Sequence, residues 1–235
     1  MSNGWNESAD AWIADNSGDG DFSRQHVLDR PMLERINKQK FATALDIGCG
    51  EGRFCRMLSN LGIAATGIDP TERLIEHARS CDPNGAYYVH YAEKLDLPDG
   101  AFDLVISYLS MIDITDIDAA VSEMVRVLRP GGTLLIANLN SFSTAATPTT
   151  WVKGDNGSEH FCLDRYMEER PEWVQWRGIR IKNWHRPFSR YMKILLSHNL
   201  ILRHFDEPLP GSEHGGMYER YYRAPYFHIM EWEKP

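Results

Sequence analysis

The sequence contains no apolar run of about 18 to 20 residues, the length that a membrane-spanning helix needs. Its first ten residues, MSNGWNESAD, also lack the basic segment followed by an apolar one that marks a signal peptide. Both absences argue against membrane insertion and against secretion. We therefore expect a cytoplasmic protein without a membrane partner.

Cysteine is scarce as well. Four cysteines are present, and no two of them form a CxxC pair or stand in a cluster with histidine. This pattern argues against structural zinc and against a framework of disulfides. The acidic segment 15–21 imitates the start of a calcium loop, but His26 stands where such a loop needs its bidentate glutamate. No metal ion is therefore expected.

Basic residues are outnumbered by acidic ones, and the formal net charge is −8 at neutral pH. Proteins that bind polyanions usually present a basic surface, so nucleic acid is disfavoured as a substrate. One basic stretch departs from this balance. It forms either a solvated, charge-balanced face or a site that recognises a carboxylate or phosphate of the substrate. Its members are Arg177, Arg180, Lys182, His185, Arg186, Arg190 and Lys193.

The most informative segment that is present runs from Leu45 to Arg53 and reads LDIGCGEGR. The apolar run over residues 41–47 predicts a strand that leads directly into glycines and a predicted helix. Glycine lets a ligand approach the backbone closely, and a helix N-terminus offers free N–H groups. Dinucleotide sites have the pattern G-x-G-x-x-G, whereas the spacing here is G-x-G-x-G. Asp46 would repel a pyrophosphate and attract an ammonium group, which favours S-adenosylmethionine.

Short apolar runs predict further strands of the same sheet. The run over residues 63–68 leads into Asp69, at the place where an acid accepts hydrogen bonds from ribose hydroxyls. The run over residues 87–91 precedes Ala92 and Glu93, which can lie beside an adenine ring. The other elements predicted for the core are strands over 102–107 and 133–138 and helices over 51–60, 71–80 and 116–128.

Four motifs in order carry a resemblance to a known family: DIGCGEGR (46–53), GIDP (67–70), AEKLDLPDGAFDLV (92–105) and VLRPGG (127–132). On these residues the chain resembles the class I S-adenosylmethionine-dependent methyltransferases, and within them the small-molecule branch similar to methyltransferase type 11. The resemblance covers about residues 40–140. It implies an α/β fold with a Rossmann-like, doubly wound sheet of seven strands, mostly parallel with the last strand antiparallel, flanked by helices.

Two regions outside the core have patterns of their own. A helix is predicted over residues 23–39, with Ser23 as its N-cap and Pro31 kinking or splitting it. Residues 141–188 are too aromatic for disorder and too long for a simple loop, so we expect a lid over the substrate. The four expected regions are an N-terminal cap or gate of helices (1–40), the cofactor-binding core (41–140), the lid (141–188) and a C-terminal part (189–235) that completes the sheet, with a helix over 188–198 and strands over 200–205 and 226–232.

The resemblance implies that S-adenosylmethionine is the cofactor and S-adenosylhomocysteine the product. Asp46 would contact the methionine ammonium, directly or through water, Asp69 the ribose, and Glu93 or its backbone the adenine edge. Arg24 is expected to reach back to the methionine carboxylate, as N-terminal basic residues of the family often do. The full set of predicted cofactor contacts is Asp46, Gly48, Cys49, Gly50, Asp69, Pro70, Ala92, Glu93, Ser107 and Arg24.

For the chemistry, His185 is the first candidate base, because an imidazole can accept a proton near neutral pH. It can equally cap the next helix or pack against its tryptophan neighbour. His160 and His214 are weaker candidates for the base, and Tyr108, at the mouth of the site, is a second candidate catalytic residue. A magnesium site formed by Asp113 with Asn138 or Asn140 is not expected, because the Asp-Asn pair that catechol methyltransferases have after the fifth strand is missing. The predicted substrate contacts are Trp12, Met111, Trp151, Trp184 and Arg186.

Together these expectations describe a methyltransferase that acts on an O or N atom of a small-molecule metabolite, as a monomer or a homodimer. An acceptor with an acidic group could meet Arg180, Arg186 or Arg190. Two alternatives stay open. The substrate could be tRNA or protein, for which the basic stretch is the support, or the chain could be a cofactor-binding regulatory protein without turnover.

Overall fold

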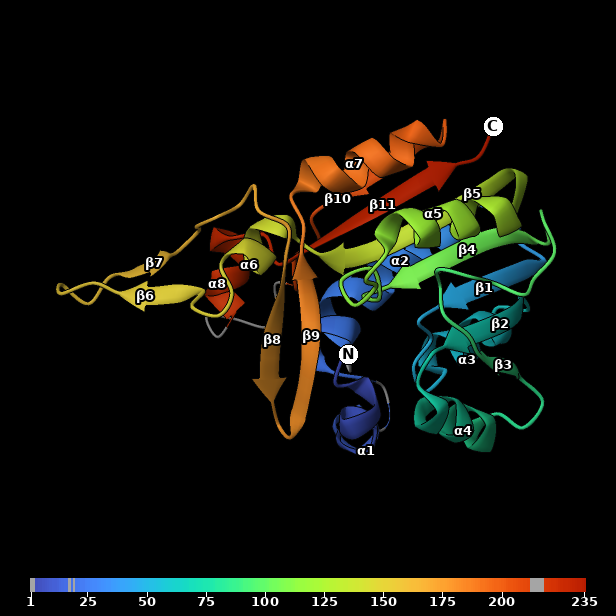
Figure 1. Ribbon diagram of the computed structural model, residues 1–235, viewed down its shortest axis with the longest axis horizontal. Coiled ribbons are helices and arrows are strands. Elements are labelled where there is room, and N and C mark those ends of the chain that lie inside the picture. The colour runs from blue at the N-terminus through green and yellow to red at the C-terminus, as the bar shows by residue number, and fades with distance from the viewer. Residues whose placement is uncertain (1–2, 17, 19, 212–217) are drawn as a thin grey trace.

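One sheet of seven strands forms the centre of the protein, for which the computed structural model describes residues 3–16, 18, 20–211 and 218–235. Six strands run parallel, and the last strand of the chain runs antiparallel to both neighbours (Figure 1). The predicted fold class is thereby confirmed. In spatial order the strands are β10 (Ile201–Asp206), β11 (Phe227–Glu233), β5 (Leu128–Leu139), β4 (Phe102–Tyr108), β1 (Thr43–Ile47), β2 (Ala64–Asp69) and β3 (Ala86–Val89).

The direction of the strand order reverses between β1 and β4, which are neighbours in the sheet although β2 and β3 separate them in the chain. The connections that leave these two strands run to opposite sides, so a crevice opens beyond their carboxyl ends. Doubly wound sheets bind their ligands in this crevice. The glycine loop, residues 48–52, begins directly at the end of β1.

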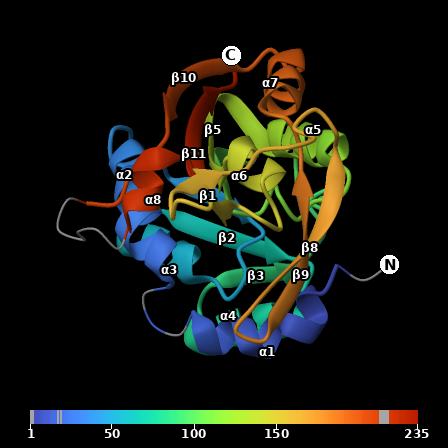
Figure 2. The same ribbon diagram turned by 90° about the vertical axis from the view of Figure 1, so that its left-hand side faces the viewer.

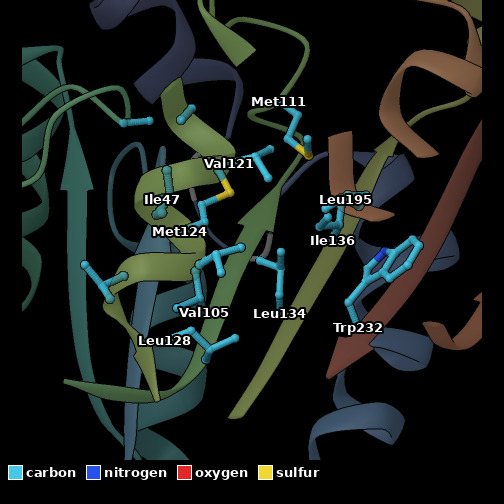
Figure 3. Packing of buried hydrophobic residues seen from close by; sticks show 14 of the residues in the cluster. Ile47, Val105, Met111, Val121, Met124, Leu128, Leu134, Ile136, Leu195 and Trp232 are labelled. Atoms are coloured by element: carbon cyan, nitrogen blue, oxygen red, sulfur yellow. The ribbon is translucent and has the colours of Figure 1, made fainter. Parts of the chain in front are cut away.

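One face of the sheet is covered by α5 (Ile117–Val127) and α7 (Phe188–Ser197). Figure 3 shows Val121 and Met124 of α5 packed over the strands, with Trp232 of β11 beside them. Both helices confirm the ranges that their apolar periodicity predicts.

The opposite face is covered by η1 (Arg24–Leu28), α2 (Asp29–Ile36) and α3 (Arg53–Asn60). Neighbouring residues of a strand point to opposite faces of the sheet, so Leu104 packs with this group while Val105 packs with the other. The sheet is therefore buried on both sides, which holds the ends of its strands in place.

The helix predicted over residues 23–39 is split, as Pro31 led us to expect. Its first part, η1, is a π-helical turn in which the backbone N–H of Asp29 donates to the carbonyl of Arg24. Pro31 has no N–H to donate to the carbonyl of Val27, so the wide turn lies where the regular ladder would be broken anyway.

The prediction that Ser23 caps this helix is wrong. Ser23 has helical backbone angles and makes no capping hydrogen bond, and its hydroxyl lies 3.4 Å from that of Tyr221. Asp21 performs the role instead, because its carboxylate accepts a 2.9 Å hydrogen bond from the backbone N–H of Arg24. An acidic N-cap three residues before the accepted donor is the usual geometry.

The expected lid region, residues 141–188, contains two hairpins and a short helix. The second hairpin turns through Arg177 and Gly178, which both have positive φ (41° and 83°), as a two-residue hairpin turn requires. Its role as a lid stays a prediction. The elements of this region are α6 (Ser141–Ala145), β6 (Trp151–Lys153), β7 (Glu159–Phe161), β8 (Arg170–Trp176) and β9 (Ile179–His185).

The N-terminal helix α1 (Trp5–Asp15) lies between the hairpin β8–β9 and α4 (Glu72–Cys81) (Figures 1 and 2). Hydrogen bonds fasten it along the edge of β9. The backbone N–H of Lys182 donates to the carbonyl of Asn3 over 2.9 Å, and the hydroxyl of Ser8 contacts both the N–H and the carbonyl of Arg180. Helix and hairpin therefore form one continuous wall.

The strands predicted over 200–205 and 226–232 are confirmed by β10 and β11. Between them lies the short helix α8 (Glu219–Arg223), whereas His214, a weaker candidate base, falls outside the described residues. Among the residues that the structure describes, no helix is long and apolar enough to cross a bilayer.

Candidate functional site

A cavity of about 380 Å³ lies in the crevice at the carboxyl ends of β1, β2 and β4. This volume falls in the range of about 300–1,000 Å³ that small-molecule sites occupy. Its walls come from both halves of the chain, because the strand ends face α1 and the hairpin β8–β9 across it. The predicted site residues that line it are Trp12, Arg24, Gly48, Gly50, Asp69, Pro70, Ala92, Glu93 and Tyr108.

The glycine loop needs its glycines for two different reasons. Gly48 and Gly50 both have positive φ, 73° and 54°. A Cβ at Gly48 would run into the side chain of Ser110, which follows β4. This contact excludes any residue larger than glycine at position 48. A Cβ at Gly50 would meet only the indole nitrogen of Trp12, at 3.7 Å, so this backbone stays open toward the cavity.

Asp69 ties the loop to the end of β2. One carboxylate oxygen accepts a 3.1 Å hydrogen bond from the N–H of Gly50, and the other accepts a 2.8 Å bond from the N–H of Thr71. Burial raises the pKa of this carboxyl, although both hydrogen bonds oppose the rise. A carboxylate has about four acceptor positions, and the Thr71 side chain is a third partner, so capacity for one further donor remains. This geometry suits a ribose.

Asp46 is buried below the loop and does not line the main cavity. It borders a second, smaller cavity of about 40 Å³ that also touches Gly48, Gly50 and Arg24. Within the described part of the chain, its Oδ1 has no hydrogen-bond partner. Desolvation raises the pKa of this carboxyl to about 7. A space of this size can hold a water, which matches the predicted contact to an ammonium group through water.

Arg24 lines the main cavity with its guanidinium 4.9 Å from the ring centre of Trp12 and 5.8 Å from that of Tyr108. It also forms an ion pair with Asp21. A guanidinium has five donors, so one carboxylate partner leaves others free for a second anion. The position is compatible with the predicted contact to the methionine carboxylate.

Tyr108 does not have the properties of a base. Its hydroxyl donates a 2.7 Å hydrogen bond to Asp29, and the same carboxylate is held by Arg53 through two contacts of 2.7 and 2.8 Å. Burial and the negative charge of Asp29 raise the pKa of the phenol well above its ordinary value. The phenol therefore stays protonated at the cavity wall, where it can position a ligand.

Two other residues predicted to contact the cofactor, Ser107 and Cys49, do not line the main cavity. Ser107 is fully buried with its hydroxyl 2.7 Å from that of Ser110, which in turn donates to the carbonyl of Ile47. Cys49 borders only the smaller cavity, and desolvation raises the pKa of its thiol well above the ordinary value. Ser107 thus supports the loop from below rather than contacting a ligand in the main cavity.

His185 lies outside the cavity, and its position does not fit the predicted role of base. It is 1% exposed, with Nδ1 2.7 Å from the hydroxyl of Thr144 and Nε2 2.8 Å from the carbonyl of Tyr166. Burial lowers the pKa of the imidazole. Both ring nitrogens are engaged in holding β9 to its neighbours, which corresponds to the structural alternative considered for this residue.

Four of the five predicted substrate contacts also lie elsewhere. Met111 is fully buried in the core. Trp151, in the first hairpin, donates a 2.7 Å hydrogen bond to the hydroxyl of Tyr226. Arg186 lies over the ring of Trp184 and donates to backbone carbonyls of residues 111, 114 and 115. Its charge therefore organises the segment after β4 and is not presented to a substrate.

The basic stretch does not form a single basic face. Arg177 pairs with Asp15 over 2.8 Å, and Arg190 pairs with Asp118 and Glu169. Along β9, alternate side chains point inward and outward, so Arg180 and Lys182 share the outer face, over the ring of Trp173, while His185 points inward. The structure thus favours the charge-balanced interpretation of this stretch.

Several cavity residues were missed by the sequence reasoning. They come from three places: the segment before and within α1, the segments after β3 and β4, and the hairpin β8–β9. Only the residues after β3 and β4 had a usable signal, because the carboxyl ends of parallel strands meet at one edge of the sheet. The missed residues include Trp5, His90, Tyr91, Asp113, Trp176 and Asn183.

Comparison with known proteins identifies the core. Residues 45–136 match the family described as a methyltransferase domain. A malonyl-acyl-carrier-protein O-methyltransferase from Serratia marcescens is 31% identical over 145 residues, which cover 60% of this chain and 56% of that protein. A ubiquinone biosynthesis O-methyltransferase from a Bradyrhizobium species is 32% identical over 116 residues, 46% of each chain. This chain thus spans about half the length of the curated relatives it matches.

The fold has close counterparts among solved structures. A protein from Listeria monocytogenes, classed as an S-adenosylmethionine-dependent methyltransferase, superimposes with a TM-score of 0.77 at 23% identity. The likeness covers 88% of this chain and 97% of that one. It therefore extends beyond the matched domain to the flanking regions of the fold.

Proposed function

We propose that this chain uses S-adenosylmethionine to methylate an O or N atom of a small-molecule metabolite, because residues 45–136 match a methyltransferase domain and the curated relatives are O-methyltransferases. The observation that carries the proposal is the cavity at the end of β1, with the glycine loop, Asp69 and Glu93 on its walls. A protein of this kind would work in the cytoplasm, as a monomer or homodimer.

The residues present fit the cofactor. The unpartnered Oδ1 of Asp46 suits an ammonium group reached through water, and Asp69 keeps acceptor capacity for a ribose hydroxyl. Glu93, which lines the same cavity, would hold the adenine edge. When bound, S-adenosylmethionine supplies an electrophilic methyl group on a positively charged sulfur. Arg24 would orient the amino-acid tail of the ligand through its remaining donors.

The protein's main contribution to such a transfer is positioning. In an in-line displacement the acceptor atom must approach the methyl group opposite the sulfur, and holding both partners in this geometry lowers the barrier greatly. The wall formed by α1 and the hairpin β8–β9 encloses the acceptor against the strand ends and excludes water. The two relatives named as O-methyltransferases support an oxygen acceptor, and nothing in the cavity walls disfavours nitrogen.

The alternatives have less support. Since Arg177 and Arg190 are paired with carboxylates and His185 and Arg186 are buried, these members of the basic stretch do not argue for tRNA or protein as a substrate. A regulatory protein without turnover would share the cofactor site, so it is separated from an enzyme only by product formation.

Calorimetric titration with S-adenosylhomocysteine tests the cofactor site, with NAD as the control ligand. We expect binding in the micromolar range for the full chain and no heat with NAD. Asp69→Ala should weaken binding at least tenfold, because it removes the acceptor of the ribose. Asp96→Ala, an exposed acid outside the cavity, serves as the matched control and should leave binding unchanged. Binding of NAD in place of S-adenosylhomocysteine would overturn the proposal.

Turnover separates the enzyme from the regulator. The chain is incubated with S-adenosylmethionine and small-molecule fractions of a cell extract, and formation of S-adenosylhomocysteine is followed. An enzyme forms product with at least one fraction, whereas a regulator forms none with any.

A further inference from the structure

The cavity has a side that the predicted cofactor contacts do not use. We call it the acceptor end, and it is lined by Trp5, Asp113, Val174, Trp176, Ile181 and Asn183. These residues come from α1, from the segment after β4 and from the hairpin β8–β9. They face the glycine loop across the cavity, so a second ligand bound here would lie next to the cofactor.

A single carboxylate stands at the acceptor end without a cationic partner. Asn183 donates a 2.6 Å hydrogen bond to Oδ1 of Asp113, and the indole N–H of Trp5 donates to the same carboxyl group. Among the described residues, no ion pair joins Asp113 to a lysine, arginine or histidine. Two donors leave about half of the carboxylate's acceptor capacity open, and this capacity faces the cavity.

Three tryptophans surround the space beside this carboxylate. The rings of Trp5 and Trp12 lie 5.0 Å apart at 77°, and those of Trp12 and Trp176 lie 6.4 Å apart at the same angle. All three rings line the cavity together with Asp113. Aromatic rings attract cations over their faces, most strongly when water is excluded.

The cavity walls are acidic overall. Four acidic residues line them: Asp21, Asp69, Glu93 and Asp113. Among the described lining residues there is one arginine, Arg24, and it is already paired with Asp21. A cleft lined by one sign of charge concentrates ligands of the opposite sign. The cavity therefore favours positively charged ligands over anions.

The arginines expected to meet an acidic acceptor are not at the acceptor end. Arg186 is bound to backbone carbonyls, and Arg190 is paired with Asp118. Arg180 lies 4.0 Å over the ring of Trp173, outside the residues that line the cavity. An acceptor that carries a carboxylate would thus meet Asp113 without a balancing cation.

We propose that the acceptor carries a cationic nitrogen, as a protonated or quaternary amine, which binds against Asp113 between Trp5, Trp12 and Trp176. This inference rests on the proposed function and names the substrate class of the same site. Asp113 neutralises the charge of the amine, and the indole faces replace the water that the amine loses. The amine anchors the acceptor, whichever of its atoms receives the methyl group.

Binding to the full chain saturated with S-adenosylhomocysteine tests this inference. The probe is benzyltrimethylammonium, and phenylacetate is the matched anion of similar size and shape. Tryptophan fluorescence and calorimetry follow the titration. At pH 8.5, where Asp113 is largely ionised, we expect the cation to bind at least tenfold more tightly than the anion, because Asp113 attracts the first and repels the second.

Two variants and one control accompany the probes. Asp113→Asn should weaken binding of the cation at least tenfold. It should leave the affinity for S-adenosylhomocysteine within about twofold of that of the unsubstituted protein. Trp176→Ala should weaken the cation about fivefold, and it removes a ring that is already 36% exposed, so the fold is not at risk. Asp116→Asn makes the same change of charge three residues further along, outside the cavity, and should change neither ligand.

Each outcome decides one of the two claims. If S-adenosylhomocysteine does not bind, the proposed function fails. If it binds while the cation binds no better than phenylacetate, or while Asp113→Asn leaves the cation unaffected, the inference fails alone. A loss of S-adenosylhomocysteine in Asp113→Asn, with the protein still folded by circular dichroism, would assign Asp113 to the cofactor and also overturn the inference.

Discussion

The two ends of the cavity are built in different ways. The cofactor end consists of loops that follow consecutive strands of one sheet, between residues 46 and 93, and its side chains are held by backbone hydrogen bonds such as those of Asp69. The acceptor end combines the segment after β4, which carries Asp113, with α1 and with a hairpin more than 150 residues from α1 in sequence, joined to it through Ser8 and Arg180. The first end is a property of the sheet, whereas the second depends on two appended elements meeting correctly.

This difference explains how one fold can serve many acceptors. The strand ends hold the cofactor regardless of what covers them, since their geometry is set by the packed sheet. The covering elements are free to differ, because only their inner faces must complement a particular acceptor. Changes at the two ends should therefore have separable effects on the two ligands.

Among the changes considered, Gly48→Ala should have the largest effect on the cofactor end, lowering both the stability of the protein and its affinity for S-adenosylhomocysteine. The added Cβ meets Ser110 and holds a side chain at a φ of 73°, so we expect a loss of about 2–4 kcal/mol in the free energy of unfolding. Binding of S-adenosylhomocysteine should weaken about 100-fold. Gly62→Ala is the control, since it has a φ of 80° but open space around it, and should reduce stability by only about 1 kcal/mol. Equal effects of the two changes would contradict the role given to Ser110.

The pH dependence of binding should separate the two ends. Burial raises the pKa of Asp113 to about 8 and that of Asp46 to about 7. Below these values a proton competes with the positively charged ligand, so affinity falls as pH falls. Between pH 8.5 and 6.5 we expect benzyltrimethylammonium to weaken about 25-fold and S-adenosylhomocysteine only about fourfold.

The groups around each acid make this difference specific. Asn183, Trp5 and Arg24 favour the ionised form of Asp113, while Asp69 opposes it. The quaternary probe does not titrate, so the change reports the protein. Calorimetry at constant ionic strength measures both ligands, and Asp113→Asn should remove the pH dependence of the cation alone. Identical profiles for the two ligands would indicate a shared titrating group.

Ser8→Ala tests whether the joint between α1 and β9 matters to the acceptor. The hydroxyl satisfies the backbone N–H and carbonyl of Arg180, and its loss leaves both groups without this partner. We expect the cation to bind about three- to fivefold more weakly, with no change for S-adenosylhomocysteine. Equal weakening of both ligands would mean that the two ends are coupled. Ser80→Ala, on the exposed end of α4, is the matched control.

His185→Ala should have the smallest effect on either ligand. The imidazole contacts Thr144 and the carbonyl of Tyr166 rather than the cavity, so we expect unchanged affinities and a loss of about 1–3 kcal/mol in unfolding free energy. Turnover per folded molecule should also be retained once an acceptor is known. Abolished turnover in a folded variant with normal binding would restore His185 as the base.

Most of the sheet and of the cofactor end could be predicted from sequence. Strands of alternating or continuous apolar residues gave the correct order of elements, and acids such as Asp69 at strand ends necessarily gather at one edge of a parallel sheet. The cap of the second helix was misplaced by two residues, because Ser23 and Asp21 are both good N-caps and only the backbone angles distinguish them.

The predicted roles of His185 and Arg186 failed because they depended on which face of the hairpin β8–β9 is covered by the rest of the protein. His185 and Arg186 look like functional residues because they are polar and stand among aromatics. Both are buried where β9 meets the body of the protein, and their donors and acceptors are used by Thr144 and by backbone carbonyls. A hairpin's register tells which residues share a face, but not which face another element will cover.

The sequence by itself determined the fold class and the glycine loop and indicated the cofactor proposed for it, because these depend on residues close in the chain and on the period of apolar side chains. The tertiary structure alone decided the acceptor end. Trp5, Asp113 and Trp176 are ordinary residues in sequence, and they form a site only because α1 and the hairpin β8–β9 pack together over the crevice. Such contacts depend on the summed packing of distant segments, which no local pattern encodes.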